Sequence, residues 1–281
     1  ANIITRKPSF DPRMDVELSY GNLDTIGASL YATTGLSDSI AMDLAFYYAN
    51  QRDGFGTNLF TGRDTNFRKD VAIRGKLLIN ASDRLTITLA ADYSMNEGPF
   101  GASQRLYRDS IGIDGQPFTG GFWDTRTDVN TNVRNEFYGG SIRAELDLGA
   151  ATLTSITAYR EVDNFLLGDL DLKPLPLFPY PLDETGKQFT QELQLTSNGS
   201  GPLRWVVGLF YLDGKGGFDP FHAEGLALAP ATSITNYTIM STTSYSAYGQ
   251  GTYALSDRTN ITAGLRFTRD ERSLHSENYV S

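Results

Sequence analysis

The feature that most restricts the fold is a hairpin pattern in residues 245–272, YSAYGQGTYALSDRTNITAGLRFTRDER. Small or apolar residues occupy every second position of 247–255 and again of 261–267. This period of two is the spacing of a β-strand, because successive side chains of a strand point to opposite sides. The connection SDRT at 256–259 is typical of a tight turn, in which Asp257 can hydrogen-bond to its own backbone. The segment is therefore predicted to form a hairpin with long arms.

The same unit recurs along the chain, and its connections alternate in length. Tight turns are predicted at five places, which are Ser37, Ser82, Gly149, Asn198 and Ser256. Most of the connections between them are predicted to be long loops, at about 51–66, 97–131, 164–187 and 213–242. We infer an all-β, antiparallel fold of about eleven strands. Its short turns lie at one end and its long loops at the other.

Strand and loop lengths indicate a membrane barrel. Arms of ten or more residues match the roughly 9–11 residues that a tilted transmembrane strand needs. Long loops without secondary structure are unusual inside a compact soluble domain, but they are expected at one end of a membrane barrel. The pattern thus favours a transmembrane β-barrel over a soluble sandwich.

Aromatic residues lie towards the predicted long-loop ends of the strands, as in an interfacial girdle. The set consists of Tyr20, Tyr48, Phe67, Tyr93, Phe137, Tyr138, Tyr159, Phe189, Tyr211 and Phe267. The alternative explanation is the ordinary preference of Tyr and Phe for strands.

Composition excludes several other classes of protein. The chain has no Cys, which removes disulfide scaffolds, thiol catalysis and Cys-based zinc sites. A net charge of -9 argues against a nucleic-acid surface, which needs clustered Lys and Arg. No apolar run approaches the roughly 18 residues of a membrane helix.

Three segments resemble the barrel of TonB-dependent outer-membrane receptors. They are KPSFDPRMDVELSYGN from Lys7, FTQELQLTSNGSGPLRWVVGLFYL from Phe189, and the 245–272 hairpin. The resemblance implies the outer membrane of a Gram-negative bacterium, with short periplasmic turns and long extracellular loops. It also implies active uptake of a scarce ligand, most commonly an iron–siderophore complex. The implied partners are membrane lipid, a plug domain inside the barrel, and an energy-coupling complex of the inner membrane.

The chain departs from that family in size. Such barrels have 22 strands, and about half of them are predicted in this sequence. Neither a plug domain nor the last strands of the barrel are recognisable. We therefore interpret residues 1–281 as a partial barrel domain, with the plug and the C-terminal strands absent. The alternative is a non-transporting β-protein, such as an adhesin or a carbohydrate-binding sandwich, which would bury Ile261 and Leu265 in a core.

Candidate ligand contacts are aromatic and Arg side chains of the predicted loops. They are Arg52, Phe55, Arg63, Arg105, Tyr107, Phe122, Trp123 and Arg126. A guanidinium group suits an anionic ligand, because its planar fork can bind a carboxylate at two points. For any single one of these residues, an ordinary loop surface is the alternative.

Other residues give weaker signals. His222 and His275 fall in predicted loops near carboxylates, but neither has the three or four convergent ligands of a metal site. Asp169 and Asp171 could contribute to a calcium site, although a solvated loop is favoured. The four prolines of 174–182 predict a stiffened loop. No nucleophile elbow or phosphate loop is present, so neither an enzyme nor a cofactor is expected.

Overall fold

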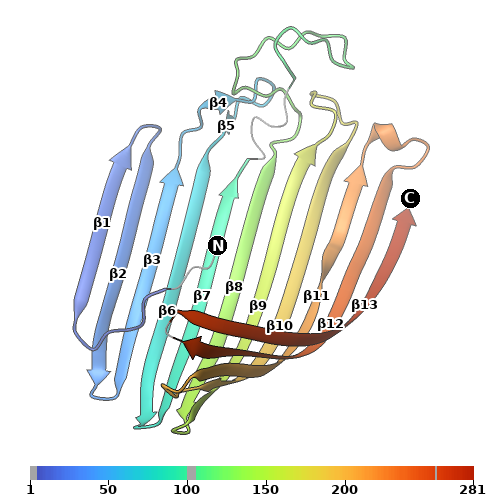
Figure 1. Ribbon diagram of the computed structural model, residues 1–281. Coiled ribbons are helices and arrows are strands. Elements are labelled where there is room, and N and C mark those ends of the chain that lie inside the picture. The colour runs from blue at the N-terminus through green and yellow to red at the C-terminus, as the bar shows by residue number, and fades with distance from the viewer. Residues whose placement is uncertain (1–4, 100–105, 257) are drawn as a thin grey trace.

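The computed structural model describes residues 5–99, 106–256 and 258–281. Its main feature is one antiparallel sheet of eleven strands, which lie side by side in sequence order (Figure 1). These strands are β1 (Arg13–Gly21), β2 (Thr25–Ser37), β3 (Ile40–Gln51), β6 (Arg68–Ser82), β7 (Leu85–Gly98), β8 (Asn132–Asp147), β9 (Ala151–Asp169), β10 (Pro179–Ser197), β11 (Leu203–Glu224), β12 (Ser233–Ser256) and β13 (Thr259–Val280). Two short strands, β4 (Gly56–Thr57) and β5 (Asp64–Thr65), form a separate ladder, and Leu226–Leu228 form a single 3₁₀ turn.

This arrangement confirms the predicted all-β, antiparallel fold. The sandwich alternative does not fit, because the strands form a single curved sheet. Leu265 is 82% exposed and Ile261 is 55% exposed, so neither lies in a core. Across the described residues β1 and β13 each pair with one neighbour, so the sheet is open at both edges. No helix among these residues has the length and apolar character needed to cross a membrane.

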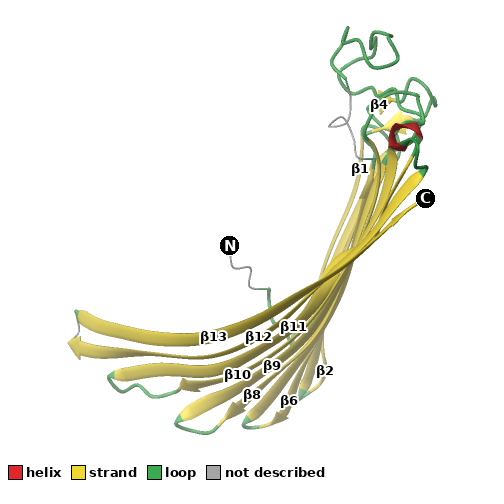
Figure 2. Ribbon diagram, turned by 90° about the vertical axis from the view of Figure 1, so that its right-hand side faces the viewer, coloured by secondary structure: helices red, strands yellow, loops and turns green. Residues whose placement is uncertain are grey.

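The two faces of the sheet differ in chemistry, as the alternation predicts. On one face apolar side chains pair across successive strands; Leu193, for example, lies opposite Leu209. The other face is polar, and it is the concave one, on whose side the N-terminal segment lies (Figure 2). Residues 5–12 contact this face, where the Ser9 amide donates to Thr33 Oγ1 over 2.8 Å and Lys76 Nζ donates to the Arg6 carbonyl.

As predicted, successive connections lie alternately at the two ends of the sheet. The tight turns at 38–39, 83–84, 148–150 and 198–202, and the turn after Ser256, gather at one end of the sheet (Figure 1). Part of that last turn, Asp257, is outside the described residues. The remaining connections lie at the opposite end, and those at 52–67 and 99–131 agree with the predicted loops.

Two predicted loops are wrong in extent. The connections expected at 164–187 and 213–242 shrink to 170–178 and 225–232, because β9 to β12 continue through most of both ranges. Likewise, β13 runs on to Val280, beyond the predicted end of the hairpin at Arg272, and it includes His275, which was predicted to lie in a loop. In these extensions polar and apolar residues occur on both faces, so the period of two that marks a half-buried strand is missing.

Each of the strands β9 to β13 therefore has two parts, which we call the turn half and the loop half. The loop halves are residues 160–169, 179–188, 212–224, 233–244 and 268–280, and the turn halves are the remainders. Aromatic rings mark part of the boundary on the convex face. Ring centroids are 6.2 Å apart between Phe189 and Tyr211, and 5.1 Å apart between Tyr211 and Tyr245.

The predicted aromatic set is only partly on this face. Tyr93 and Tyr138 pair there, with ring centroids 5.3 Å apart. Phe137 precedes Tyr138 in β8 and therefore points to the concave side. Consecutive residues of a strand cannot both belong to one row of a girdle.

Candidate ligand-binding site

Two loops at the long-connection end are docked on each other as one unit. Asn58, 2% exposed, donates through Nδ2 to the carbonyl oxygen and Oγ1 of Thr127 over 3.0 and 3.1 Å. The Thr127 amide returns a hydrogen bond to Asn58 Oδ1 over 3.3 Å. Backbone bonds join the same segments, from Leu59 N to the Thr125 carbonyl and from Thr125 N to the Thr57 carbonyl. A buried amide with its polar groups satisfied on a second loop fixes the relative position of both.

Three of the predicted ligand contacts meet in this unit. Trp123 packs edge-on against Phe55 and Phe122, with ring centroids 4.7 and 4.6 Å apart. The three side chains are 44%, 41% and 63% exposed. The Trp123 carbonyl accepts a hydrogen bond from Thr65 Oγ1, so the cluster is held by both loops. A rigid aromatic surface is thus presented at the outer end of the sheet.

Arg126 belongs to a neighbouring ionic cluster around Asp114. Arg126 Nη2 lies 3.5 Å from Asp114 Oδ2, and Lys173 Nζ lies 3.2 Å from Asp114 Oδ1. Lys173 is fully buried and also donates to the Gln116 carbonyl, which ties the 170–178 loop to the 106–131 loop. Burial raises the pKa of Asp114, but the hydrogen bond from Gln116 and the charge of Lys173 outweigh it and leave this pKa below its usual value.

Of the other predicted contacts, Arg52 lies away from both clusters. Arg52 Nη1 pairs instead with Asp24 Oδ2 in the β1–β2 turn, 3.2 Å away. Arg63 and Tyr107 are exposed on their loops, Tyr107 by 77%. Arg105 lies outside the described residues. Sequence reasoning missed Asn58 and Lys173, for which the sequence carries no distinguishing signal.

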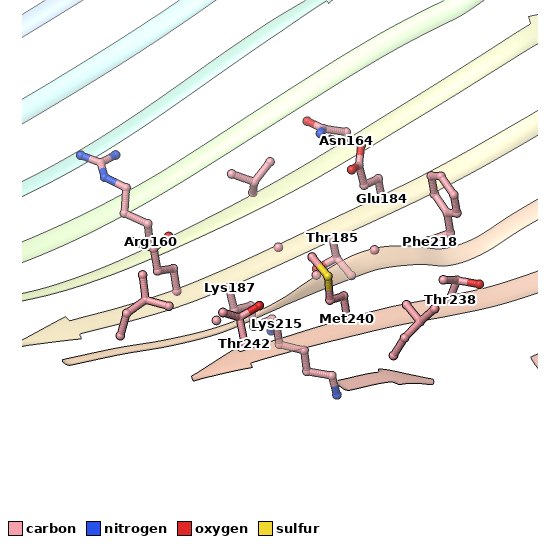
Figure 3. A pocket seen from close by; sticks show the side chains of 18 residues that line it. Arg160, Asn164, Glu184, Thr185, Lys187, Lys215, Phe218, Thr238, Met240 and Thr242 are labelled. Carbon is pink, nitrogen blue, oxygen red and sulfur yellow. Dashed lines mark hydrogen bonds between the residues drawn. The ribbon is translucent and has the colours of Figure 1, made fainter. Parts of the chain in front are cut away.

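A hollow of ≈ 780 Å³ lies in the wall formed by the loop halves of β9 to β13 (Figure 3). Its floor lacks side chains, because Gly186 lies directly opposite Gly216, with Gly214 nearby on the same strand. Polar and apolar groups surround it, among them Arg160, Asn164, Glu184, Gln188, Phe218, Thr238, Met240 and Leu274. The hollow can accept a ligand that has both polar and apolar parts.

Arg160 is held in place by an ion pair across a glycine. Its Nη1 and Nη2 donate to the two carboxylate oxygens of Asp92 over 2.9 and 3.1 Å. The intervening strand carries Gly139, where a Cβ atom would lie 2.7 Å from Arg160 Nη1. Gly139 therefore makes room for the side chain to cross β8. The two-point contact fixes the guanidinium beside the hollow.

The sequence contained a signal for this hollow. Three glycines fall within Gly214–Gly217, inside the predicted loop at about 213–242, and glycine is depleted in strands. In the structure these glycines lie inside β11, where they leave space instead of marking a turn.

Three weaker predictions are corrected. His222 and His275 lie on strands, where His222 Nδ1 is 2.8 Å from Thr235 Oγ1 and His275 Nε2 is 3.0 Å from Glu277 Oε1. Asp169 is fully buried at the end of β9, not in a solvated loop. Burial, followed by the charge of Asp171, raises the pKa of Asp169 to about 8. The described residues contain no group of three or more His, Asp or Glu that could hold a metal ion.

Comparison with known proteins places this sheet in a recognised fold. A scan against family models found no match. Among solved structures, the sheet is similar to the ferric yersiniabactin uptake receptor FyuA of Yersinia pestis, with a TM-score of 0.77 and 17% identity over 98% of this chain and 42% of that one. It is also similar to the ferric-catecholate import receptor Fiu of Escherichia coli K12, with a TM-score of 0.68, 14% identity, and 96% and 46% coverage.

A third similar structure is the ferripyoverdine receptor of the outer membrane of Pseudomonas aeruginosa, with a TM-score of 0.69 and 13% identity. The match covers 98% of this chain and 39% of that receptor. The chain thus spans less than half of the length of each of these receptors. At such identities the likeness establishes the fold.

Proposed function

We propose that the chain, which has the barrel fold of TonB-dependent outer-membrane receptors, forms part of a receptor that takes up a scarce ligand, an iron–siderophore complex. The observation that carries this proposal is the convex face of the sheet near its short-turn end. Its apolar side chains are exposed over the whole width of the sheet, including Val207, Leu209 and Leu265. A continuous exposed apolar band calls for an apolar environment, which the hydrocarbon of the outer membrane supplies.

The dimensions of the band support a membrane location. In β10 it runs from Phe189 to Ser197 and in β11 from Leu203 to Tyr211, about nine residues each, the length that a tilted transmembrane strand needs. The aromatic rings at its upper border suit the membrane–water interface. The loop halves then extend into the external medium.

The ligand is proposed to contact the concave wall and the docked loops. Arg160 and its neighbours in the hollow offer charge and hydrogen bonds, and the Phe55–Phe122–Trp123 cluster offers aromatic surface. The similar structures are receptors for iron chelates by name, ferric yersiniabactin and ferripyoverdine among them. The plug domain, the rest of the barrel and the energy-coupling complex are proposed to lie outside these 281 residues.

Growth and uptake assays test this proposal. A strain lacking the whole receptor, supplied in turn with radiolabelled iron bound to catecholate, hydroxamate and mixed siderophores, is expected to lose uptake of at least one of them. Re-expression of the full-length receptor restores that uptake. Normal uptake of every iron chelate in the deletion strain would contradict the proposal.

The hollow has its own matched test. The nearest atom to a Cβ built at Gly186 is Val162 Cβ at 3.9 Å, so Gly186→Phe fills the hollow without a backbone clash. Thr185→Phe adds an aromatic ring to the adjacent residue, which points to the opposite face. We expect Gly186→Phe to weaken binding of the transported chelate about tenfold, roughly 1.4 kcal/mol, and Thr185→Phe to leave it unchanged. Equal binding by both variants would exclude the hollow as a ligand contact.

A further inference from the structure

The largest fully buried side chains of the described residues lie in or beside the outer connections of the sheet. They are those of Phe118, Lys173, Asn58 and Asp169. A single-layer sheet has no second layer to cover its side chains, so a core of this kind must be built by the connections themselves. These connections gather beyond one end of the sheet (Figure 2). We call them the outer cap and number them in chain order, as 52–67, 106–131, 170–178 and 225–232.

The first and second connections of the cap share a small apolar core. Phe118 is 1% exposed and lies against Gly120, where a Cβ atom would be 2.5 Å from Phe118 Cζ and 3.1 Å from Leu59 Cδ1. Phe118 belongs to the second connection and Leu59 to the first, so both connections pack on the same glycine. The hydrogen bonds between Asn58 and Thr127 join the same two connections.

The second and third connections are joined by the buried side chain of Lys173. Its Nζ lies 3.2 Å from Asp114 Oδ1 and donates to the Gln116 carbonyl over 3.2 Å. Its stem crosses the second connection at Gly112, where a Cβ atom would overlap Lys173 Cε. A larger residue at position 112 would therefore displace the lysine, and the ammonium reaches its partners only because glycine leaves the space.

Backbone hydrogen bonds join the third and fourth connections. The Leu226 amide donates to the Pro176 carbonyl over 3.0 Å, and the Ala227 amide donates to the Leu177 carbonyl over 3.1 Å. Gly225, with φ of 129°, lies so close to the Leu177 carbonyl that a side chain there would collide with it. Each of the four connections is thus attached to the next, and the second and third each take part in two joints.

We propose that the outer cap opens in one cooperative step, with Lys173 as the residue that couples its two sides. Ordinary surface loops open separately, because few buried contacts link them. In the cap, movement of the third connection alone would separate Lys173 from Asp114, and breaking a buried ion pair is strongly destabilising. Movement of the second connection alone would also leave the amide of Asn58 without its partner.

Cooperative opening has a consequence for ligand access. The cap carries the aromatic cluster of Phe55, Phe122 and Trp123, so that surface is presented only while the whole cap is closed. This consequence rests on the proposed function, whereas the cooperative opening does not.

Hydrogen exchange in the full-length receptor, reconstituted in lipid vesicles, tests the proposal. Lys173→Met removes the ammonium and keeps an unbranched side chain of similar length. We expect it to speed up exchange about tenfold in all four connections, including the first, with which Lys173 makes no hydrogen bond or ion pair among the described residues. The matched control is Lys215→Met, at an exposed position of β11 outside the cap, which should leave exchange in the cap unchanged.

A second variant perturbs the cap from its other end. Leu226→Pro removes the N–H that donates to Pro176, and it should also speed up exchange about tenfold in the first connection. Its control is Ala231→Pro in the same connection, at a residue whose N–H donates to no other connection among the described residues. This pair decides the question if Lys173→Met does not fold.

The site of the acceleration separates the outcomes. Faster exchange confined to the segments next to each substitution, or no change in the first connection with either variant, would overturn the cooperative cap. Faster exchange of the first connection in either control would overturn it as well. A receptor that takes up no iron chelate but shows the shared acceleration would refute the proposed transport alone. A receptor that transports a chelate but shows only local acceleration would refute the cap alone.

Discussion

The turn halves and loop halves of β9 to β13 form one continuous ladder, yet their sequences differ in character. In the turn halves apolar residues such as Leu193 and Leu209 alternate with polar ones, and pairing continues without a break into the loop halves. There the same face carries Lys187, Lys215 and Glu271. Both regions have the backbone conformation of a β-strand. The alternation of apolar and polar residues therefore depends on the surroundings of each face and does not by itself indicate whether a strand is present.

The difference indicates what stabilises each region. The turn halves are proposed to be stabilised by lipid on the convex face. In the loop halves, water reaches both faces, so stability comes from ladder hydrogen bonds and cross-strand side-chain pairs such as Lys187–Glu161 and Asn236–Asn278. Perturbations of the two regions should therefore have different consequences.

A charge placed in the apolar band is expected to have the largest effect. Leu193 and Thr185 both lie on the convex face of β10, in the turn half and the loop half respectively. Leu193→Arg should lower the free energy of unfolding of the full-length receptor in lipid vesicles by about 2–4 kcal/mol, because it puts a guanidinium in hydrocarbon. Thr185→Arg should change it by less than about 0.5 kcal/mol. Similar losses in the two variants, measured by urea unfolding, would show that the halves share one environment.

Sequence reasoning succeeded where one face touches an apolar medium. Sequence alone could predict the strands, the five tight turns and the end that carries the long connections. Local features encode them, namely the alternation of apolar and polar residues and the turn residues at positions such as Ser82. It failed in the loop halves, where the local sequence does not alternate. There, residues such as Thr242 and His275 belong to strands because they pair with residues of the neighbouring strands. The site depends still more on long-range contacts. Asn58 meets Thr127, 69 positions away, and no local pattern encodes such a pair.

A proline in a loop half should have the next largest effect. Thr242 was predicted to be in a loop, but it pairs with Gly214 on one side and Arg272 on the other. Thr242→Pro removes a ladder donor from a central strand and should cost about 1–3 kcal/mol by leaving a partner unsatisfied. Hydrogen exchange of residues 233–244 should accelerate accordingly. The control Ala231→Pro, in the β11–β12 connection, should leave the exchange rates unchanged. Unchanged exchange in Thr242→Pro would mean that this half is not a stable strand.

The smallest and most local effect is expected at the end of β9, where Asp169 joins the loop half to the docked loops. Its folded pKa of about 8 is raised above the ordinary 3.8 by burial and by Asp171. A raised carboxyl pKa gives stability that is complete below the ordinary value and is lost as the pH rises towards the folded value. The loops should therefore loosen between about pH 4 and pH 8 and stay loose above it. Limited proteolysis of the 106–131 loop, followed from pH 5 to pH 9, should speed up over that range.

Asp169→Asn should abolish this pH dependence of proteolysis, whereas Asp109→Asn, at an exposed loop position, should retain it. A pH profile that is the same in Asp169→Asn and the unaltered receptor would place the titrating group elsewhere.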